Sequence, residues 1–134
     1  MPNGDGELLT LARDEAWNMM RSQSVGRLAV SAAGQPDIFP VNFLASEHSI
    51  LIRTTAGTKV AAMAENDLVA FEVDYLGATD AWSVVVKGLA RRLEEEHAIQ
   101  EAAKSPLWTW IRRPTDVFIR ILPHDVNGRY FHRD

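Results

Sequence analysis

Two cations and three hydroxyl groups fall within seven residues in the segment Arg53-Thr-Thr-Ala-Gly-Thr-Lys59. The segment follows an apolar, strand-like run and precedes a run of helix formers. Gly57 would allow a positive φ, and Thr58 is placed to cap the helix, whose first N–H groups attract anions. Cations at 53 and 59, with hydroxyls at Thr54 and Thr58, suit a phosphate monoester. The same residues also fit a strand exit before a capped helix, with Lys59 in solvent.

A proline stands inside the strand-like segment Pro40-Val-Asn-Phe43. Because proline has no N–H to donate, it is disfavoured inside a sheet unless its nitrogen faces an edge or a ligand. The segment therefore predicts an open strand edge at Pro40. Either a ligand covers this edge, or it is a plain edge strand with a buried Phe43.

Hydrophobic periodicity predicts more strands than helices. Helices are expected over about 11–21, 58–65 and 94–103, and strands over 26–33, 38–45, 50–53, 68–73, 81–93, 116–122 and 126–131. Gly88 is expected to form a bulge, Asn127-Gly128 a tight turn, and Trp108 and Trp110 the cover of one barrel mouth. The fold class is therefore α+β, mainly β: a six- to seven-stranded antiparallel barrel with short flanking helices.

The chain has 134 residues, a length typical of one domain, with a hydrophobic fraction of 46% that favours a globular fold. Residues 1–10 are expected to be a flexible leader and residues 11–134 the folded domain. The absence of cysteine excludes disulfides, thiol redox chemistry and iron–sulfur ligation. Any redox chemistry would therefore need a bound cofactor.

The formal net charge of −4 disfavours a nucleic-acid partner, although small barrels can bind single strands. No apolar run approaches the roughly 18 residues of a membrane span, and the N-terminus lacks a signal-peptide pattern, so the chain is expected to be cytoplasmic with no membrane partner. The four histidines lack the spacing of a metal pair, and no Ser-His-Asp arrangement can be inferred. No metal site and no catalytic side chain are predicted.

Five segments, taken in order, resemble the pyridoxamine 5'-phosphate oxidase-like family. They are Gly26-Arg-Leu-Ala-Val30, Pro36-Asp-Ile-Phe-Pro-Val-Asn-Phe-Leu44, the segment 53–59, Val69-Ala-Phe-Glu-Val-Asp74 and Trp82-Ser-Val-Val-Val-Lys-Gly88. The resemblance covers roughly residues 14–131. It implies a split β-barrel that binds FMN or a related deazaflavin.

The resemblance also assigns roles to single positions. The strand that matches Pro40-Val41-Asn42 runs beside the flavin ring, with the backbone at Val41 and Asn42 facing the pyrimidine edge. Arg53, Thr54, Thr58 and Lys59 match phosphate-binding positions. Trp82 and Ser83 match positions that reach the flavin from the second subunit, which implies a homodimer; Trp82 also fits a core residue at a strand start.

The resulting functional hypothesis is an FMN-binding oxidoreductase in which a small-molecule substrate stacks on the flavin. The family's longer C-terminal segment, which holds the phosphate of pyridoxamine phosphate, is missing after Arg129, so oxidation of that substrate is not expected. Three alternatives stay open. They are a reductase that uses the deazaflavin coenzyme F-420, a non-catalytic flavin- or haem-binding module, and a structural dimer with a vestigial cleft.

Overall fold

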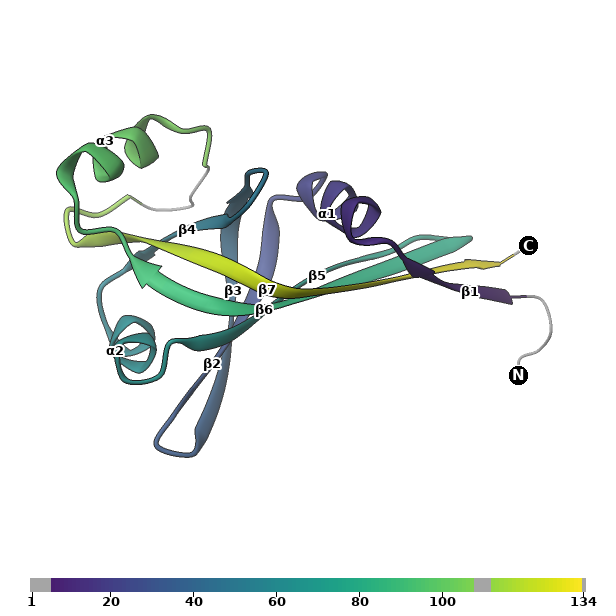
Figure 1. The fold of residues 1–134 in the computed structure, drawn as a ribbon, viewed down its shortest axis with the longest axis horizontal. Coiled ribbons are helices and arrows are strands. Elements are labelled where there is room, and N and C mark those ends of the chain that lie inside the picture. The colour runs from purple at the N-terminus through teal and green to yellow at the C-terminus, as the bar shows by residue number, and fades with distance from the viewer. Residues whose placement is uncertain (1–5, 108–111, 134) are drawn as a thin grey trace.

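The computed structural model describes residues 6–107 and 112–133 (Figure 1). The helices are α1 (Arg13–Arg21), α2 (Thr58–Glu65) and α3 (Glu96–Lys104). The strands are β1 (Gly6–Leu11), β2 (Val25–Ala32), β3 (Gln35–Ala45), β4 (Ile50–Thr55), β5 (Leu68–Leu76), β6 (Asp80–Arg92) and β7 (Asp116–Arg133). The predicted class, α+β and mainly β, is confirmed.

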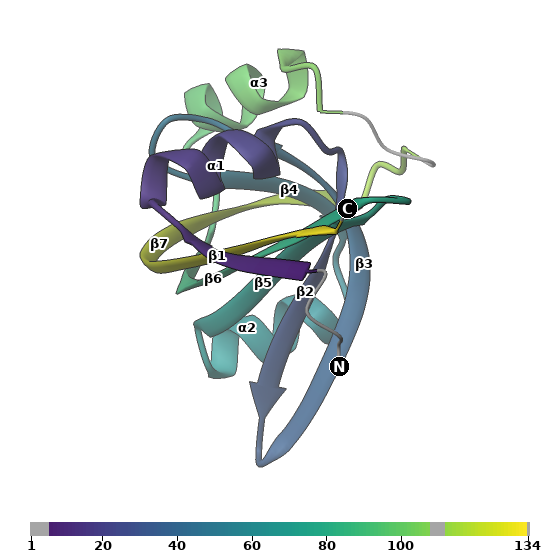
Figure 2. The same ribbon diagram turned by 90° about the vertical axis from the view of Figure 1, so that its right-hand side faces the viewer.

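All seven strands of the described chain form one antiparallel sheet in the order β1-β7-β4-β3-β2-β5-β6. Because β6 also pairs with β7, the six strands from β7 to β6 close into a barrel, and β1 is added to the outer part of β7. Closure removes most of the unpaired strand edges that would otherwise invite aggregation. In Figures 1 and 2 the paired ends of β5, β6, β7 and β1 extend beyond the barrel as a long arm beneath α1.

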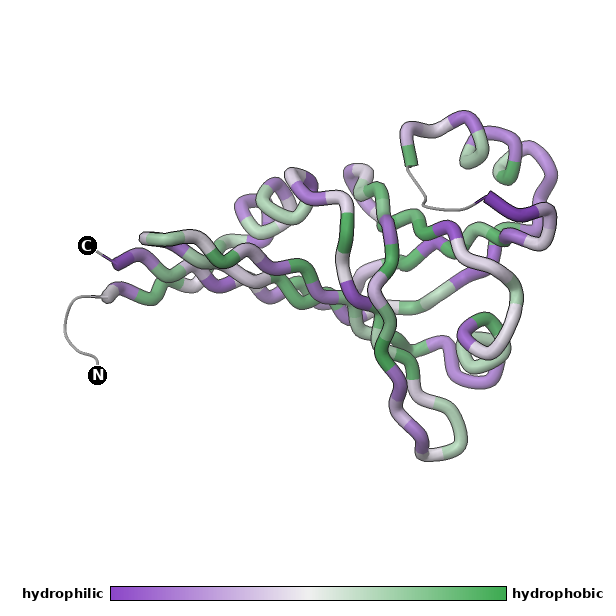
Figure 3. The backbone as a smooth tube through the Cα atoms, turned by 180° about the vertical axis from the view of Figure 1, so that it is seen from behind, coloured by the Kyte–Doolittle hydropathy of each residue, from purple (hydrophilic) through white to green (hydrophobic). Residues whose placement is uncertain are grey.

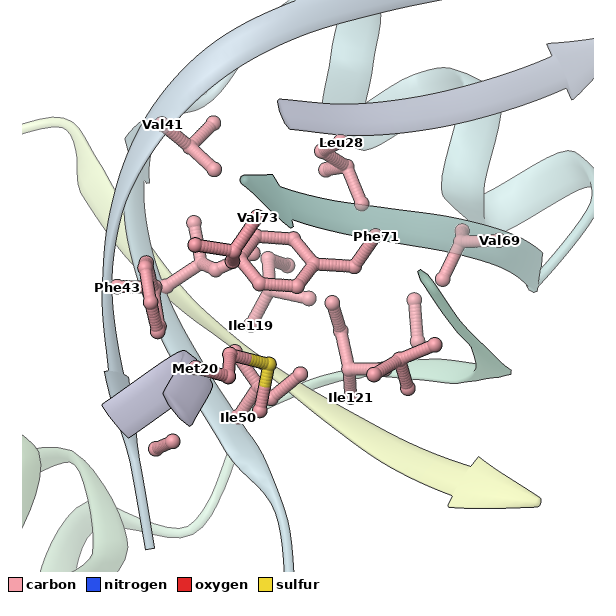
Figure 4. Close-up of a cluster of buried hydrophobic side chains, with 14 of the residues drawn as sticks. Met20, Leu28, Val41, Phe43, Ile50, Val69, Phe71, Val73, Ile119 and Ile121 are labelled. Carbon is pink, nitrogen blue, oxygen red and sulfur yellow. The ribbon is translucent and has the colours of Figure 1, made fainter. Parts of the chain in front are cut away.

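The barrel interior is filled by side chains that alternate along the strands (Figure 4). Phe71 of β5 is fully buried and meets Phe43 of β3 edge to face, with ring centroids 4.9 Å apart. Met20 of α1 closes one end of this core, and the indole N–H of Trp17 donates to the Ser46 carbonyl, which ties α1 to the β3–β4 connection. The helix predicted at 11–21 thus covers one end of the barrel.

The strands β6 and β7 pair over nearly their whole length, and this corrects one prediction. Residues 116–122 and 126–131 were expected to be two strands with a tight turn at Asn127-Gly128, but β7 runs unbroken through both. Gly128 serves close packing instead: a Cβ there would lie 2.6 Å from the Ala16 Cβ of α1. The glycine is needed because a helix crosses the strand at this point, which residue types alone do not reveal.

The flexible leader expected over residues 1–10 is not seen over residues 6–10, the part of it that the structure describes. Residues 6–11 form β1, which pairs in register with β7 from Gly6 opposite Arg133 to Leu11 opposite Gly128. A long partner strand with a free edge explains this pairing, since its backbone groups would otherwise stay unpaired. Trp108 and Trp110, expected to cover a barrel mouth, lie outside the described residues. Within the described part, no helix is long and apolar enough to cross a membrane.

The β6–β7 register shifts between Lys87 and Gly88, where a bulge was predicted, but the extra residue is His124 of β7 and not a residue of β6. A Cβ at position 88 would lie 2.3 Å from the Leu122 carbonyl oxygen of β7. We therefore expect Gly88→Ala to lower the free energy of unfolding by about 1–3 kcal/mol, the usual cost of overpacking. Urea denaturation measures this change. Gly57→Ala is the matched control, since no atom lies within 4 Å of that position; equal losses in both variants would contradict the steric explanation.

Candidate functional site

The ladder between β3 and β4 ends early. These strands pair only over Phe43–Ala45 and Ile50–Ile52 within the described chain. Below these three pairs β3 continues with β2 to the hairpin at the bottom of Figure 1, while β4 turns away towards α2. We call the gap bounded by residues 40–42 and 53–55 the β3–β4 split. Of the predicted residues, Pro40 and Asn42 lie on its β3 side, and Arg53 and Thr54 on its β4 side.

The hydrogen-bond alternation on β3 shows which backbone groups face the split. The Phe43 N–H donates to the Ser24 carbonyl, on the β2 side, so the backbone groups of Val41 point the same way. The groups of Asn42 and Pro40 therefore point towards β4. Proline stands where a strand N–H would have had no ladder partner, which explains how β3 tolerates it.

The side chain of Asn42 also belongs to the split. Val41 and Phe43 are buried in the core, so Asn42 points to the opposite face of β3, as Arg53 does on β4. Asn42 is only 9% exposed, and its Oδ1 is fully buried without a hydrogen-bond partner among the described residues. An unpaired buried acceptor costs about 1–3 kcal/mol, so a donor from outside the described residues would stabilise this side chain.

Asp116 of β7 holds Arg53 in place. The Arg53 Nε donates to Asp116 Oδ2 at 2.9 Å, and the guanidinium lies 5.2 Å from the Phe118 ring centroid. Asp116 also accepts from the Thr55 hydroxyl and the Arg113 N–H, each at 3.0 Å. Because the pairing uses Nε, both terminal guanidinium nitrogens have no partner in the described chain and are available to an anion.

Burial of the Asp116 carboxylate would by itself raise its pKa. The hydrogen bonds from the Arg113 N–H, Arg53 and Thr55, together with the Arg53 charge, outweigh this effect, and the pKa of Asp116 lies below its ordinary value. Asp116 is therefore a carboxylate at neutral pH. It neutralises part of the Arg53 charge while fixing its direction.

Lys59 lies at the start of α2, with its Nζ 4.7 Å from the Phe39 ring centroid of β3. This cation–π contact links α2 to β3 and fixes the ammonium near the split without neutralising it. The helix start differs from the prediction. Gly57 has φ 170°, an extended value rather than a positive-φ turn, and it is the N-cap; Thr58 is the first helical residue, and no side chain caps the helix. The first N–H groups of α2 are therefore open to an anion.

The two threonines of β4 lie on opposite faces of the strand. Thr54 follows the core-facing alternation of Ile50 and Ile52, so its hydroxyl and the Arg53 guanidinium lie on opposite faces of β4. Thr55, on the same face as Arg53, is exposed and donates its hydroxyl to Asp116.

Trp82 and Ser83 lie on β6, far along the sheet from the split. Three inter-strand steps, β3-β2-β5-β6, separate them from Pro40, or about 14 Å at ~4.8 Å per step. Neighbouring strand residues point to opposite faces of the sheet, although Trp82 and Ser83 both line a cavity with Leu76. Ser83 lies on the outer face and lines a cavity with Arg129, whereas Trp82 packs against the core and Tyr75, with ring centroids 6.5 Å apart.

A charged cluster occupies the outer face between these two regions. Arg27 of β2 is opposite Pro40 on one side and Glu72 on the other, and it contacts Glu72 at 3.2 Å and Asp74 at 3.0 Å. Burial, followed by the Asp74 charge, raises the pKa of Glu72. The cluster therefore lies on the outer face between the strand of Pro40 and that of Ser83.

Three contributors to the site were missed from the sequence: Asp116, Phe39 and the side chain of Asn42. Asp116 is 63 residues from Arg53 in the chain, so no local spacing could connect them. Asn42 was expected to act through its backbone alone. No group of three or more His, Asp or Glu residues able to hold a metal occurs in residues 6–107 and 112–133.

The chain matches the model of the pyridoxamine 5'-phosphate oxidase family over residues 12–130, and it belongs to this family. The curated protein Rv0080 of Mycobacterium tuberculosis is 33% identical over 134 residues, covering 95% of this chain and 88% of Rv0080. A solved structure from Corynebacterium glutamicum is 36% identical with a TM-score of 0.88, covering 94% and 99% of the two chains. An FAD binding protein from Mycobacterium smegmatis is 31% identical with a TM-score of 0.80, covering 94% and 100%.

The lowered pKa of Asp116 predicts a pH-dependent contribution to stability. Because the folded-state pKa is depressed, the contribution is complete above the ordinary aspartate pKa and is lost as pH falls through the folded value. Asp116→Asn should therefore lower the free energy of unfolding by about 1–3 kcal/mol at pH 7, with the difference shrinking below about pH 4. Urea titrations at several pH values measure it, with the exposed Asp125→Asn as control. A difference that is constant down to pH 3 would contradict the ionic role.

Proposed function

We propose that this chain is a flavin-dependent oxidoreductase that binds FMN in the β3–β4 split as a homodimer and acts on a small-molecule substrate. The observation that carries the proposal is the buried, unpartnered Oδ1 of Asn42 beside the backbone of Pro40 and Asn42. The oxidised flavin ring has one N–H, on its pyrimidine edge. A lone buried acceptor next to exposed strand backbone is complementary to that edge.

The phosphate end of the ligand is supported independently. Arg53 offers two terminal nitrogens, Lys59 an ammonium without a carboxylate partner in the described chain, and α2 an uncapped N-terminus. Together they satisfy a dianionic phosphate by charge-assisted bonds. The similarity to an FAD binding protein also supports a flavin as the ligand.

The bound flavin would supply the hydride chemistry, and the chain would supply binding, orientation and electrostatics. Asn42 and its backbone would orient the pyrimidine edge, and Arg53 and Lys59 would hold the phosphate. The Asn42 N–H, which faces the split, would also stabilise negative charge developing on that edge during reduction. No acid or base of the protein is required by this scheme.

A second subunit is supported by the distance of Ser83 from the split and by apolar side chains left exposed. Leu76 is 82% exposed, Ile38 63% and Leu8 62%. Leu8 and Leu76 lie on the arm, which Figure 3 shows with repeated hydrophobic positions reaching its tip. A two-fold dimer covers such surface twice, once on each copy, and brings Ser83 of one copy to the split of the other.

Two substitutions separate the ring from the phosphate. Lys59→Ala should weaken FMN binding by about 1.5–3 kcal/mol and leave riboflavin, which has no phosphate, nearly unchanged. Asn42→Ala should weaken both ligands by about 0.5–1.5 kcal/mol without lowering the stability of the unliganded protein, because it removes an unsatisfied acceptor. Calorimetry on each protein–ligand pair measures this. The proposal fails if neither ligand binds the parent protein, or if both variants bind FMN as the parent does.

Complementation between subunits tests the shared site. Lys59→Ala damages the split, and Ser83→Arg blocks the outer face of β6, so each homodimer should bind FMN weakly. Co-folded heterodimers contain one undamaged site, made of Lys59 from one chain and Ser83 from the other, and about half the parent binding capacity should return. The measurement is FMN stoichiometry in purified heterodimers. Absence of rescue, or a monomeric mass in light scattering, would show that each site is built within one chain.

A further inference from the structure

A cavity of about 400 Å³ opens where β2 leaves β5. Within the described chain the two strands pair only from Arg27 opposite Glu72 to Ala29 opposite Ala70. Beyond this point β2 continues with β3 into the hairpin that extends away from the barrel in Figures 1 and 2, while β5 stays paired with β6. We call the gap bounded by residues 29–31, 36 and 68–70 the β2–β5 wedge. Its volume lies in the range of about 300–1,000 Å³ typical of ligand pockets.

The walls of the wedge are apolar and reach the core of the barrel. Val30 of β2 and Val69 of β5 line the wedge and belong to the buried core cluster. Ala29 and Ala70 stand opposite each other where the strand pairing ends, and their small side chains leave space that larger residues would fill. Leu68, another lining residue, is 57% exposed. A ligand that covered these side chains would remove apolar surface from water, which stabilises the complex.

One edge of the wedge carries a cation. Lys87 of β6, which stands opposite Ala70, lines the wedge together with His124 of β7. His124 is the extra residue at the register shift beside Gly88, and such irregularities commonly turn a side chain towards a site. Among the described residues that line the wedge there is no Asp or Glu. Asp125 is the cross-strand neighbour of Lys87, but no ion pair of Lys87 is found in residues 6–107 and 112–133.

We propose that the β2–β5 wedge binds an apolar monocarboxylate, such as a medium-chain fatty acid. The hydrocarbon chain would lie against the valines and alanines of the walls, and Lys87 would bind the carboxylate by a charge-assisted hydrogen bond. The imidazole of His124 can donate a second hydrogen bond to the same group. The site is separate from the β3–β4 split, and Lys87 is four residues, or about 13 Å along β6, from Ser83. The inference therefore goes beyond the proposed function and does not depend on it.

Calorimetry on the full chain tests the hydrocarbon chain and the carboxylate separately. Hexanoate, octanoate and decanoate, each below the concentration at which it forms micelles, should bind about tenfold more tightly for every two carbons added. Decanol, which has no charge, should bind about tenfold more weakly than decanoate. Lys87→Met should weaken decanoate by about tenfold or more and leave decanol unchanged. Ala70→Phe fills the wedge and should abolish the binding of both.

Matched controls lie at the exposed end of α3. Lys104→Met and Ala103→Phe make the same changes of charge and size there, and both should bind decanoate as the parent does. Lys87 is exposed, so Lys87→Met decides the matter even if Ala70→Phe does not fold.

The inference is overturned if decanoate does not bind, if affinity does not depend on chain length, or if Lys87→Met binds decanoate like the parent. It is also overturned if light scattering shows a dimeric parent and a monomeric, folded Ala70→Phe, because a second copy then fills the wedge. FMN is titrated into the same proteins. Failure of FMN to bind would refute the proposed function and leave the binding of decanoate as it stands.

Discussion

The site depends on one constraint, which is that β3 and β4 pair over only three residues each. Had the ladder continued, the backbone groups of Pro40, Asn42 and Thr55 would face a neighbouring strand, and the barrel would have no opening there. The early end of the ladder leaves two facing edges whose groups must be satisfied by water or a ligand. An exposed edge normally invites aggregation, yet this one is short and begins with a proline. The short length of this edge and its proline lower the risk of aggregation, and they also make the edge suitable for a ligand.

A cation beside such an opening needs a fixed direction, and Asp116 provides it. An ion pair at a protein surface contributes little, but the Asp116 side chain is only 5% exposed and accepts three hydrogen bonds. Burying this carboxylate would cost several kcal/mol if Arg53 were absent. Arg53 and Asp116 therefore depend on each other. Thr55 completes the arrangement, so the last residues of β4 are constrained by β7 rather than by β3.

The elements were predictable from the sequence because they depend on local pattern. The alternation of β3, the helix formers of α2 and the irregularity at Gly88 each depend on a few neighbouring residues. The register of strand pairs and the close approach of one element to another do not depend on neighbouring residues alone. Gly128 could be assigned to a turn because nothing nearby in the chain shows that α1 crosses it, and β1 could be assigned to a leader because its partner lies more than a hundred residues away. Tertiary contacts overrode local preference at both places.

The candidate site shows the same division. The residue types at 53–59 indicated an anion site, but the face of the strand that each side chain takes could be assigned only from the strand parity. Once the parity of β4 is known from the buried Ile50 and Ile52, Arg53 and Thr55 must share the outer face and Thr54 must leave it. On β6 the same rule separates Trp82 from Ser83. Ser83 is the outer-face residue of the two.

The strand order then limits how the two halves of the site can meet. Asn42 and Ser83 stand on the same sheet, three strands apart, and the Arg27–Glu72–Asp74 cluster occupies the outer face between them. Folding one chain differently cannot shorten that distance, because every intervening strand is paired on both sides near the cluster. In the proposed dimer, a two-fold axis would bring Ser83 close to Asn42 of the other copy. It turns the outer face of one copy towards the split of the other and repeats the contact. The polar cluster would then lie within the interface, where its paired charges fix the orientation of the two copies more than they add affinity.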